Sequence, residues 1–217
     1  MTKKKLYAFI WDSVMVLSII IAVLWYFIPG NIDALGSTGT GSFRYFTTDS
    51  NILIAASTLI HMVYKAVNLN KNDSIAPRWL GALRYAAVTA GALTFLEVLL
   101  FMFPTAVFLG GIRGALRCYE NNVFVLHFSA PLMMFISFVF FDKDYRPDKK
   151  ERLIAMIPVI IYSVVYFAMV VVFRYWPDFY RFTFGGRYAF IPLVFVVIYS
   201  ATFGISALIQ YLKHTGA

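Results

Sequence analysis

NVFVLHFSAPLMMFISFVFF, residues 122–141, contains no charged side chain and is long enough to cross a bilayer as a helix. About 20 predominantly apolar residues span the hydrocarbon core of a membrane. The same criterion, applied to the rest of the chain, predicts six such helices, over residues 6–28, 49–68, 84–107, 122–141, 153–173 and 188–212. The sequence therefore predicts an all-α, polytopic integral membrane protein, in which residues 1–217 form one bundle of six transmembrane helices.

The overall composition supports the same fold class. Of the 217 residues, 60% are hydrophobic and 14% are charged, and the mean hydropathy is +0.72. A soluble domain of this length would need far more polar surface. The apolar run after Lys5 is longer than the core of a cleaved signal, and no small-residue cleavage site follows it. We therefore expect this run to be the first transmembrane helix.

The basic residues that give the chain its net charge of +8 fall mainly in alternate connectors. One side of the membrane is expected to carry 13 of them: Lys3, Lys4, Lys5, Lys65, Lys71, Arg78, Arg84, Lys143, Arg146, Lys149, Lys150, Arg152 and Lys213. The other side is expected to carry 6: Arg44, Arg113, Arg117, Arg174, Arg181 and Arg187. Because cytoplasmic loops are enriched in Lys and Arg, we expect both termini to be cytoplasmic. No basic stripe carries interleaved aromatic residues, so nucleic acid is not an expected partner.

Two polar strings interrupt the apolar sequence, FRYFTTDSN at residues 43–51 and NNVFVLHFSAP at residues 121–131. Polar groups inside a membrane are costly and are functional candidates by default. Thr47 and Asn51 are four residues apart and share one face of a helix. With a rise of 1.5 Å per residue, His127 lies about 8 Å below the start of its helix and Glu97 about 20 Å along its own. We expect these four side chains to meet in one layer.

A threonine hydroxyl becomes a nucleophile when a base removes its proton, and histidine is the usual base near neutral pH. We therefore interpret Thr47 as the candidate nucleophile and His127 as the candidate base. An asparagine amide or backbone N–H groups at the start of the second helix would stabilise an oxyanion, and a carboxylate would orient the imidazole. The candidate supporting residues are Thr48, Asp49, Asn51, Glu97, Asn121 and Asn122.

Each of these candidates also has a purely structural interpretation. Thr47, Thr48 and Ser50 lie at a helix start, where hydroxyl groups cap free backbone N–H groups. His127 would also serve as a packing residue that is hydrogen-bonded across helices. Cys118 precedes His127 by nine residues, about 13 Å along a helix, and is a weak candidate for the nucleophile.

Metal chemistry has little support in the sequence. Catalytic zinc needs about three protein ligands that converge on one point. His61 lies about 21 Å from Thr47 along the same helix, and His214 is in the C-terminal tail. We therefore expect no metal and no cofactor. Asp12 and His61 both fall in the inner half of the membrane by the same arithmetic, and we interpret them as a structural pair.

The two polar strings resemble a known family. Phe-x-Tyr-Phe-Thr-x-x-Ser-Asn at 43–51, followed by Asn-x-x-x-x-His-x-x-x-Pro at 122–131, is similar to the androgen-induced protein family, which includes the androgen-dependent TFPI-regulating protein and bacterial homologues. The resemblance implies a six-helix intramembrane threonine hydrolase of the bacterial inner membrane that cleaves fatty acid esters of hydroxy fatty acids. By motif, the nucleophile corresponds to Thr47 and the histidine to His127. The adjacent Thr48 leaves the position of the nucleophile open by one residue.

The expected partners are a lipid or fatty-acyl ester substrate and the lipids of the membrane. A non-catalytic lipid-binding protein is the main alternative, because a cavity lined by Phe, Leu and Met would serve either role. A secondary transporter is less well supported, since the sequence shows no inverted repeat and no pair of broken helices.

Overall fold

Six helices are long and apolar enough to cross a membrane in the computed structural model, which describes residues 3–32, 37–68 and 76–215. They cover Lys5–Phe27, Phe46–Val67, Arg78–Tyr119, Asn121–Phe141, Glu151–Val172 and Tyr188–Thr215. No strand occurs in these described residues. The prediction of an all-α, six-helix membrane protein is thus confirmed.

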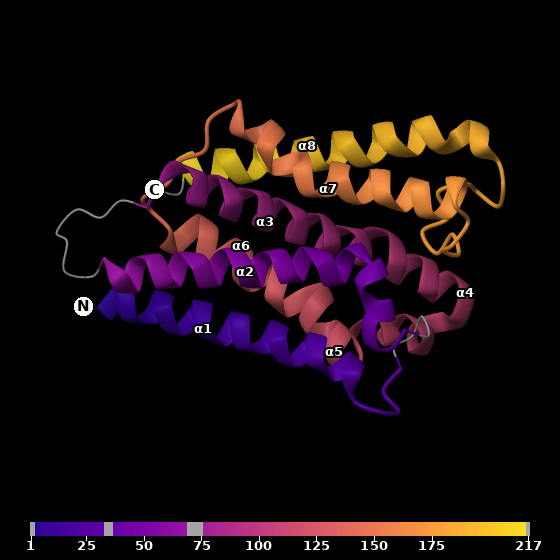
Figure 1. Ribbon diagram of the computed structural model, residues 1–217, viewed down its shortest axis with the longest axis horizontal. Helices are drawn as coiled ribbons and strands as arrows, with labels where there is room; N and C mark the ends of the chain where they lie inside the picture. The colour runs from indigo at the N-terminus through magenta and orange to yellow at the C-terminus, as the bar shows by residue number, and fades with distance from the viewer. Residues whose placement is uncertain (1–2, 33–36, 69–75, 216–217) are drawn as a thin grey trace.

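Several of the spans are divided into shorter helical elements (Figure 1). The α-helices are α1 (Lys3–Leu24), α2 (Phe46–Val67), α3 (Arg78–Glu97), α4 (Phe103–Leu116), α5 (Asn121–Phe124), α6 (Ala130–Ile136), α7 (Glu151–Phe167) and α8 (Ile191–Thr215). Four π-helices are η3 (Val98–Met102), η5 (Val125–Ser129), η6 (Ser137–Phe141) and η7 (Ala168–Val172). The 3-10 helices are η1 (Trp25–Phe27), η2 (Gly39–Arg44), η4 (Arg117–Tyr119) and η8 (Tyr188–Phe190).

The second and third spans differ most from the predicted boundaries. The second begins at Phe46 instead of residue 49, so that Thr47 lies inside the helix. The third runs from Arg78 to Tyr119 instead of 84–107. Pro104 does not end it, because this proline lies in the first turn of α4, directly after the π-helix η3, where a missing N–H is tolerated. Gly111, with φ 69° and ψ −177°, is not helical, and α4 consists of two helical segments that meet at a kink there.

The start of α1 and the end of α8 lie at the same end of the bundle, which we call the terminal end (Figure 1). The opposite end, which holds η2 and the connector between α7 and α8, we call the distal end. The positive-inside argument predicts that the terminal end faces the cytoplasm.

Helix α3 is the central element of the bundle and contacts α2, α6, α7 and α8. Small residues make up much of its buried surface: Gly81, Ala82, Ala86, Ala87, Ala90 and Gly91. Small side chains let membrane helices approach each other closely. At Gly81 the approach is tightest, because a Cβ atom there would lie 2.1 Å from the ring of Tyr145.

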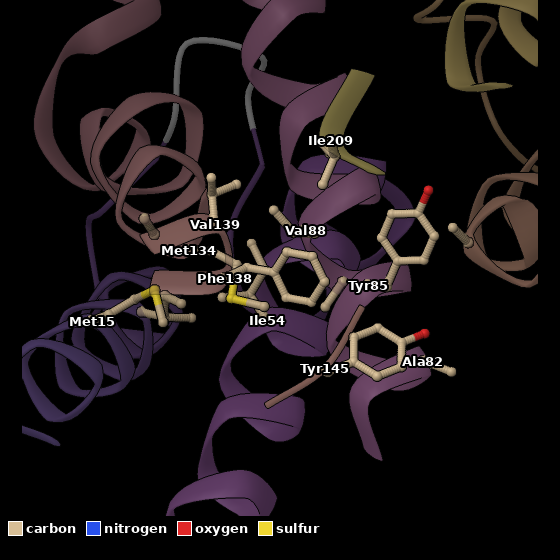
Figure 2. Close-up of a cluster of buried hydrophobic side chains, with 14 residues drawn as sticks. Met15, Ile54, Ala82, Tyr85, Val88, Met134, Phe138, Val139, Tyr145 and Ile209 are labelled. Atoms are coloured by element: carbon tan, nitrogen blue, oxygen red, sulfur yellow. The ribbon is translucent and has the colours of Figure 1, made fainter. Parts of the chain in front are cut away.

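Figure 2 shows how the largest buried apolar cluster joins these helices. Met15 comes from α1, Ile54 from α2, Val88 from α3 and Ile209 from α8, and all four are buried. The Phe138 ring of η6 stacks against Tyr85 of α3, with 5.8 Å between centroids and 8° between planes. The cluster therefore packs α2 and the 121–141 span against α3. This packing positions the polar residues that lie farther along α2 and farther along that span.

The connector between α7 and α8 is folded around one carboxylate. Asp178 accepts hydrogen bonds from the backbone N–H groups of Phe182 and Thr183, each at 2.8 Å, and also from the Thr183 hydroxyl and the Tyr166 hydroxyl. Burial acts to raise the pKa of Asp178, but these hydrogen bonds outweigh it and hold the pKa below its ordinary value. The same connector reaches the start of α2, where the hydroxyl of Tyr180 accepts a hydrogen bond of 3.2 Å from the N–H of Phe46.

Candidate functional site

The first turn of α2 carries Thr47. The helix begins at Phe46 after Tyr45, and no side chain caps its N-terminus. Thr47 is half-buried, and its hydroxyl makes no hydrogen bond with any described residue. The capping interpretation of Thr47 is therefore wrong. The neighbouring Thr48 is fully buried, and Ser50 bonds across to Thr94 of α3 at 2.9 Å.

Asn51 connects this turn of α2 to the span that carries His127. Its side-chain nitrogen Nδ2 donates to the carbonyl oxygen of Thr47 and to that of Leu126, each at 2.7 Å. Asn51 is fully buried, and Leu126 immediately precedes His127 in the π-helix η5. One amide thus brings the backbone of Thr47 against the backbone next to His127.

The imidazole of His127 is oriented by a backbone carbonyl. Its Nδ1 atom lies 2.7 Å from the carbonyl oxygen of Cys118. A carbonyl only accepts hydrogen bonds, so Nδ1 carries the proton. In a neutral imidazole the lone pair is then on Nε2, which is the nitrogen able to act as a base.

The Cys118 carbonyl comes close because the chain turns between η4 and α5. Glu120 is extended, with φ −84° and ψ 149°, and Asn121 has φ 52°, a left-handed conformation that asparagine tolerates better than most residues. The expected separation of Cys118 and His127 by about 13 Å assumed a continuous helix and does not apply. The side chain of Asn121 is exposed, so the prediction that it belongs to the polar layer is not supported by its position.

The π-helix at His127 follows from a proline four residues later. Pro131 has no N–H with which to bond the carbonyl oxygen of His127, as a regular α-helix would require. A wider turn over Val125–Ser129 accommodates the missing bond. Asn122, one turn earlier, donates from Nδ2 to the carbonyl oxygen of Ala22 at 3.1 Å and ties this span to α1.

The two carboxylates expected near His127 lie elsewhere. Asp49 lines a cavity between α2 and α7, on a different face of α2 from Asn51. Glu97 acts electrostatically on Tyr180: burial, the neighbouring Tyr162 and then Glu97 all raise the pKa of Tyr180. In the described part of the chain, neither carboxylate forms a hydrogen bond or an ion pair with His127. The group that orients the imidazole is the carbonyl oxygen of Cys118, and not a carboxylate as predicted.

Asp12 and His61 belong to one buried network nearer the terminal end, but they do not contact each other directly. The Ser137 hydroxyl donates to Asp12 at 2.6 Å and accepts from Arg84 at 2.9 Å. Asp142 lies 3.3 Å from Arg84 and 3.8 Å from His61. Arg84 is fully buried. The sequence predicted only that Arg84 lies on the cytoplasmic side, at the start of its helix, whereas the network holds its side chain inside the bundle.

Within the three described ranges, no group of three or more His, Cys, Asp or Glu residues is arranged to hold a metal ion. Comparisons of the chain with family models, with curated proteins and with solved structures give no significant match. The fold defines the chain as a multi-pass helical membrane protein. A more specific assignment rests on the chemistry of the polar residues at its distal end.

Proposed function

We propose that this protein is an intramembrane lipid-ester hydrolase in which Thr47 is the nucleophile and His127 is the general base. The observation that carries the proposal is the hydrogen bond from His127 Nδ1 to the Cys118 carbonyl, which places the proton on Nδ1 and the lone pair of the neutral imidazole on Nε2. The bridge that Asn51 makes between Thr47 and Leu126 supports it, because it holds the two candidate segments together.

The proposed reaction has two steps. Nε2 of His127 takes the proton of the Thr47 hydroxyl while the threonine oxygen attacks the ester carbonyl carbon. The same proton then passes to the leaving alkoxide oxygen, so that an alcohol departs and an acyl-threonine remains. In the second step His127 deprotonates a water molecule, whose oxygen attacks the acyl carbon; the bond to the threonine oxygen breaks, His127 returns the proton to that oxygen, and a carboxylic acid is released.

The oxyanion donor is proposed to come from the backbone at the start of α2. Asn51 does not qualify, because both of its N–H groups are occupied by the carbonyl oxygens of Thr47 and Leu126. The first turn of a helix carries unpaired N–H groups and a partial positive charge. The N–H of Thr47 itself makes no hydrogen bond with any residue that the structure describes, whereas that of Phe46 is bonded to Tyr180.

The resemblance of residues 43–51 and 122–131 to the androgen-induced protein family supports a fatty acid ester of a hydroxy fatty acid, or a related lipid ester, as the substrate. Location in the bacterial inner membrane with both termini in the cytoplasm is proposed on the same resemblance and on the distribution of Lys and Arg.

The decisive experiment is a turnover assay on a panel of lipid esters with the native protein, Thr47→Ala and Thr48→Ala. Thr47→Ala should abolish hydrolysis and labelling by a fluorophosphonate probe, while Thr48→Ala should retain both. His127→Ala should be as severe as Thr47→Ala, and the double variant little worse, because residues that act as a unit lose function together. Full activity in both threonine variants would rule out the proposal.

A non-catalytic lipid-binding function is the second candidate. It is favoured by the cavity between α2 and α7, which has a volume of about 250 Å³ and mostly apolar walls. Binding of lipid esters with no turnover of any of them, in a preparation with native thermal stability, would favour this second function.

A further inference from the structure

The cavity between α2 and α7 is a second place where polar and apolar groups meet at the distal end. Its volume is about 250 Å³. The residues that matter for its chemistry are Phe46, Asp49 and Leu53 of α2, Pro158 and Ile161 of α7, and Trp176 of the connector between α7 and α8. Its walls therefore come mainly from two membrane-spanning helices, and a tryptophan of the connector also lines it.

Asp49 is the acidic residue among those that line the cavity. Within the described ranges, the Asp49 side chain forms neither an ion pair nor a hydrogen bond. The hydroxyl groups of the lining are already engaged: Ser50 bonds to Thr94, and the Tyr162 hydroxyl donates to the carbonyl oxygen of Arg44 at 2.7 Å. An uncompensated carboxylate among apolar groups is unfavourable, and a bound cation offsets this cost.

The cavity is separate from the face of α2 that carries Thr47. Successive residues of a helix are rotated by about 100°, so Asp49 points roughly opposite to Thr47, whereas Asn51 shares the face of Thr47. An inference about this cavity therefore does not rest on the proposed hydrolase function.

We propose that this cavity binds a single-chain lipid that carries a primary ammonium group, with the ammonium at Asp49 and the alkyl chain against Phe46, Leu53 and Ile161. Charge complementarity selects the ammonium group, because Asp49 is the acidic residue of the lining and pairs with no cationic side chain in the described ranges. The apolar walls select the chain, since burying it removes apolar surface from water. The volume selects a single chain: it lies below the range of roughly 300–1,000 Å³ that is typical of sites for whole drug-sized ligands.

Quenching of Trp176 fluorescence provides the test. The full-length protein in detergent micelles is titrated with a terminally brominated dodecylamine and, separately, with the brominated alcohol of the same length. The native protein should show saturable quenching by the amine, with an affinity at least about tenfold higher than for the alcohol, the range of one charge-assisted contact. Trp176→Phe should remove this quenching component and leave that of the other tryptophans.

Asp49→Asn should weaken amine binding by about tenfold and leave alcohol binding unchanged. The matched control is Glu120→Gln, which removes an exposed carboxylate and should leave both affinities unchanged. Equal affinities of the native protein for amine and alcohol would overturn the proposal without reference to any variant. Unchanged amine affinity in Asp49→Asn would overturn it as well.

Discussion

His127 donates a hydrogen bond from Nδ1 to the backbone carbonyl of Cys118, with 2.7 Å between nitrogen and oxygen. In a Ser-His-Asp triad this place belongs to a carboxylate, which fixes the tautomer and also stabilises the imidazolium that forms during the reaction. A backbone carbonyl fixes the tautomer in the same way but contributes no negative charge. The candidate base of this protein is therefore oriented by a group that no side-chain substitution removes.

The first prediction concerns Cys118. Because only its backbone contacts His127, Cys118→Ala should leave ester hydrolysis and fluorophosphonate labelling close to native levels. Initial rates on the best substrate of the panel provide the measurement, and His127→Ala, which should be inactive, is the control. Loss of activity in Cys118→Ala with normal thermal stability would point to a role for the thiol.

Asn51→Ala should lower both stability and activity. The substitution removes two hydrogen bonds, one to the carbonyl oxygen of Thr47 and one to that of Leu126, and losing bonds of buried polar groups costs about 1–3 kcal/mol. Thermal denaturation in detergent measures the loss. Asn31→Ala is the matched control, because Asn31 donates to the Trp25 carbonyl in a half-buried loop and its loss should be smaller. Equal melting temperatures for the two variants would contradict the bridging role of Asn51.

Arg84→Met should be strongly destabilising. It leaves the buried carboxylates of Asp12 and Asp142 without their cation, and breaking one partner of a buried pair typically costs about 3–5 kcal/mol. Arg78→Met removes an exposed arginine that pairs with Asp148 and Glu151, and should have a much smaller effect. Melting temperatures of the two variants test the difference, and similar values would argue against a buried charge network.

Gly81→Ala should destabilise the protein by about 1–3 kcal/mol, the usual range for overpacking. The new Cβ atom would lie 2.1 Å from the Tyr145 ring, which is itself packed against Phe138. Gly204→Ala in α8 is the control, because nothing lies within 4 Å of its added Cβ atom and alanine is the better helix former. A melting temperature that rises alike in both variants would show that helix propensity, and not the ring contact, decides the outcome.

The connector between α7 and α8 should lose stability in acid. The pKa of Asp178 is lower in the folded protein than in the unfolded chain, whose ordinary value is about 3.9. Its contribution is therefore fully present above that value and is lost as the pH falls through the lower, folded pKa. Limited proteolysis of the connector should accelerate on acidification below about pH 4 in the native protein. Asp178→Asn should be cleaved faster at neutral pH and respond less to acid.

The six helices were predictable because the thickness of the bilayer, and not the tertiary packing, determines how long an apolar run must be. The depth of Asn51 and His127 in the membrane was predicted from helix geometry, because each residue of a helix adds about 1.5 Å along the helix axis. Their contact through Leu126 agrees with the predicted layer.

Three features of the structure were not predicted from the sequence. The Cys118 carbonyl was missed because a break at Glu120 and Asn121 carries no strong signal in an apolar sequence. The burial of Arg84 was missed because counting basic residues at the edges of apolar runs does not reveal which side chains point into the bundle. The position of Asp49 depends on which side of α2 packs against α7, and a single sequence does not specify it.

The hydrogen bond between Phe46 and Tyr180 also bears on the order in which the protein is made. Chains fold from the N-terminus as they are synthesised, so α2 and the 121–141 span are available long before the connector that carries Tyr180. Until that connector emerges, the N–H of Phe46 lacks its native partner, and the distal end of α2 is incomplete. The hairpin of α7 and α8 therefore completes the segment that carries Thr47, and the newly made protein acquires its candidate site only after the connector between these two helices has been synthesised.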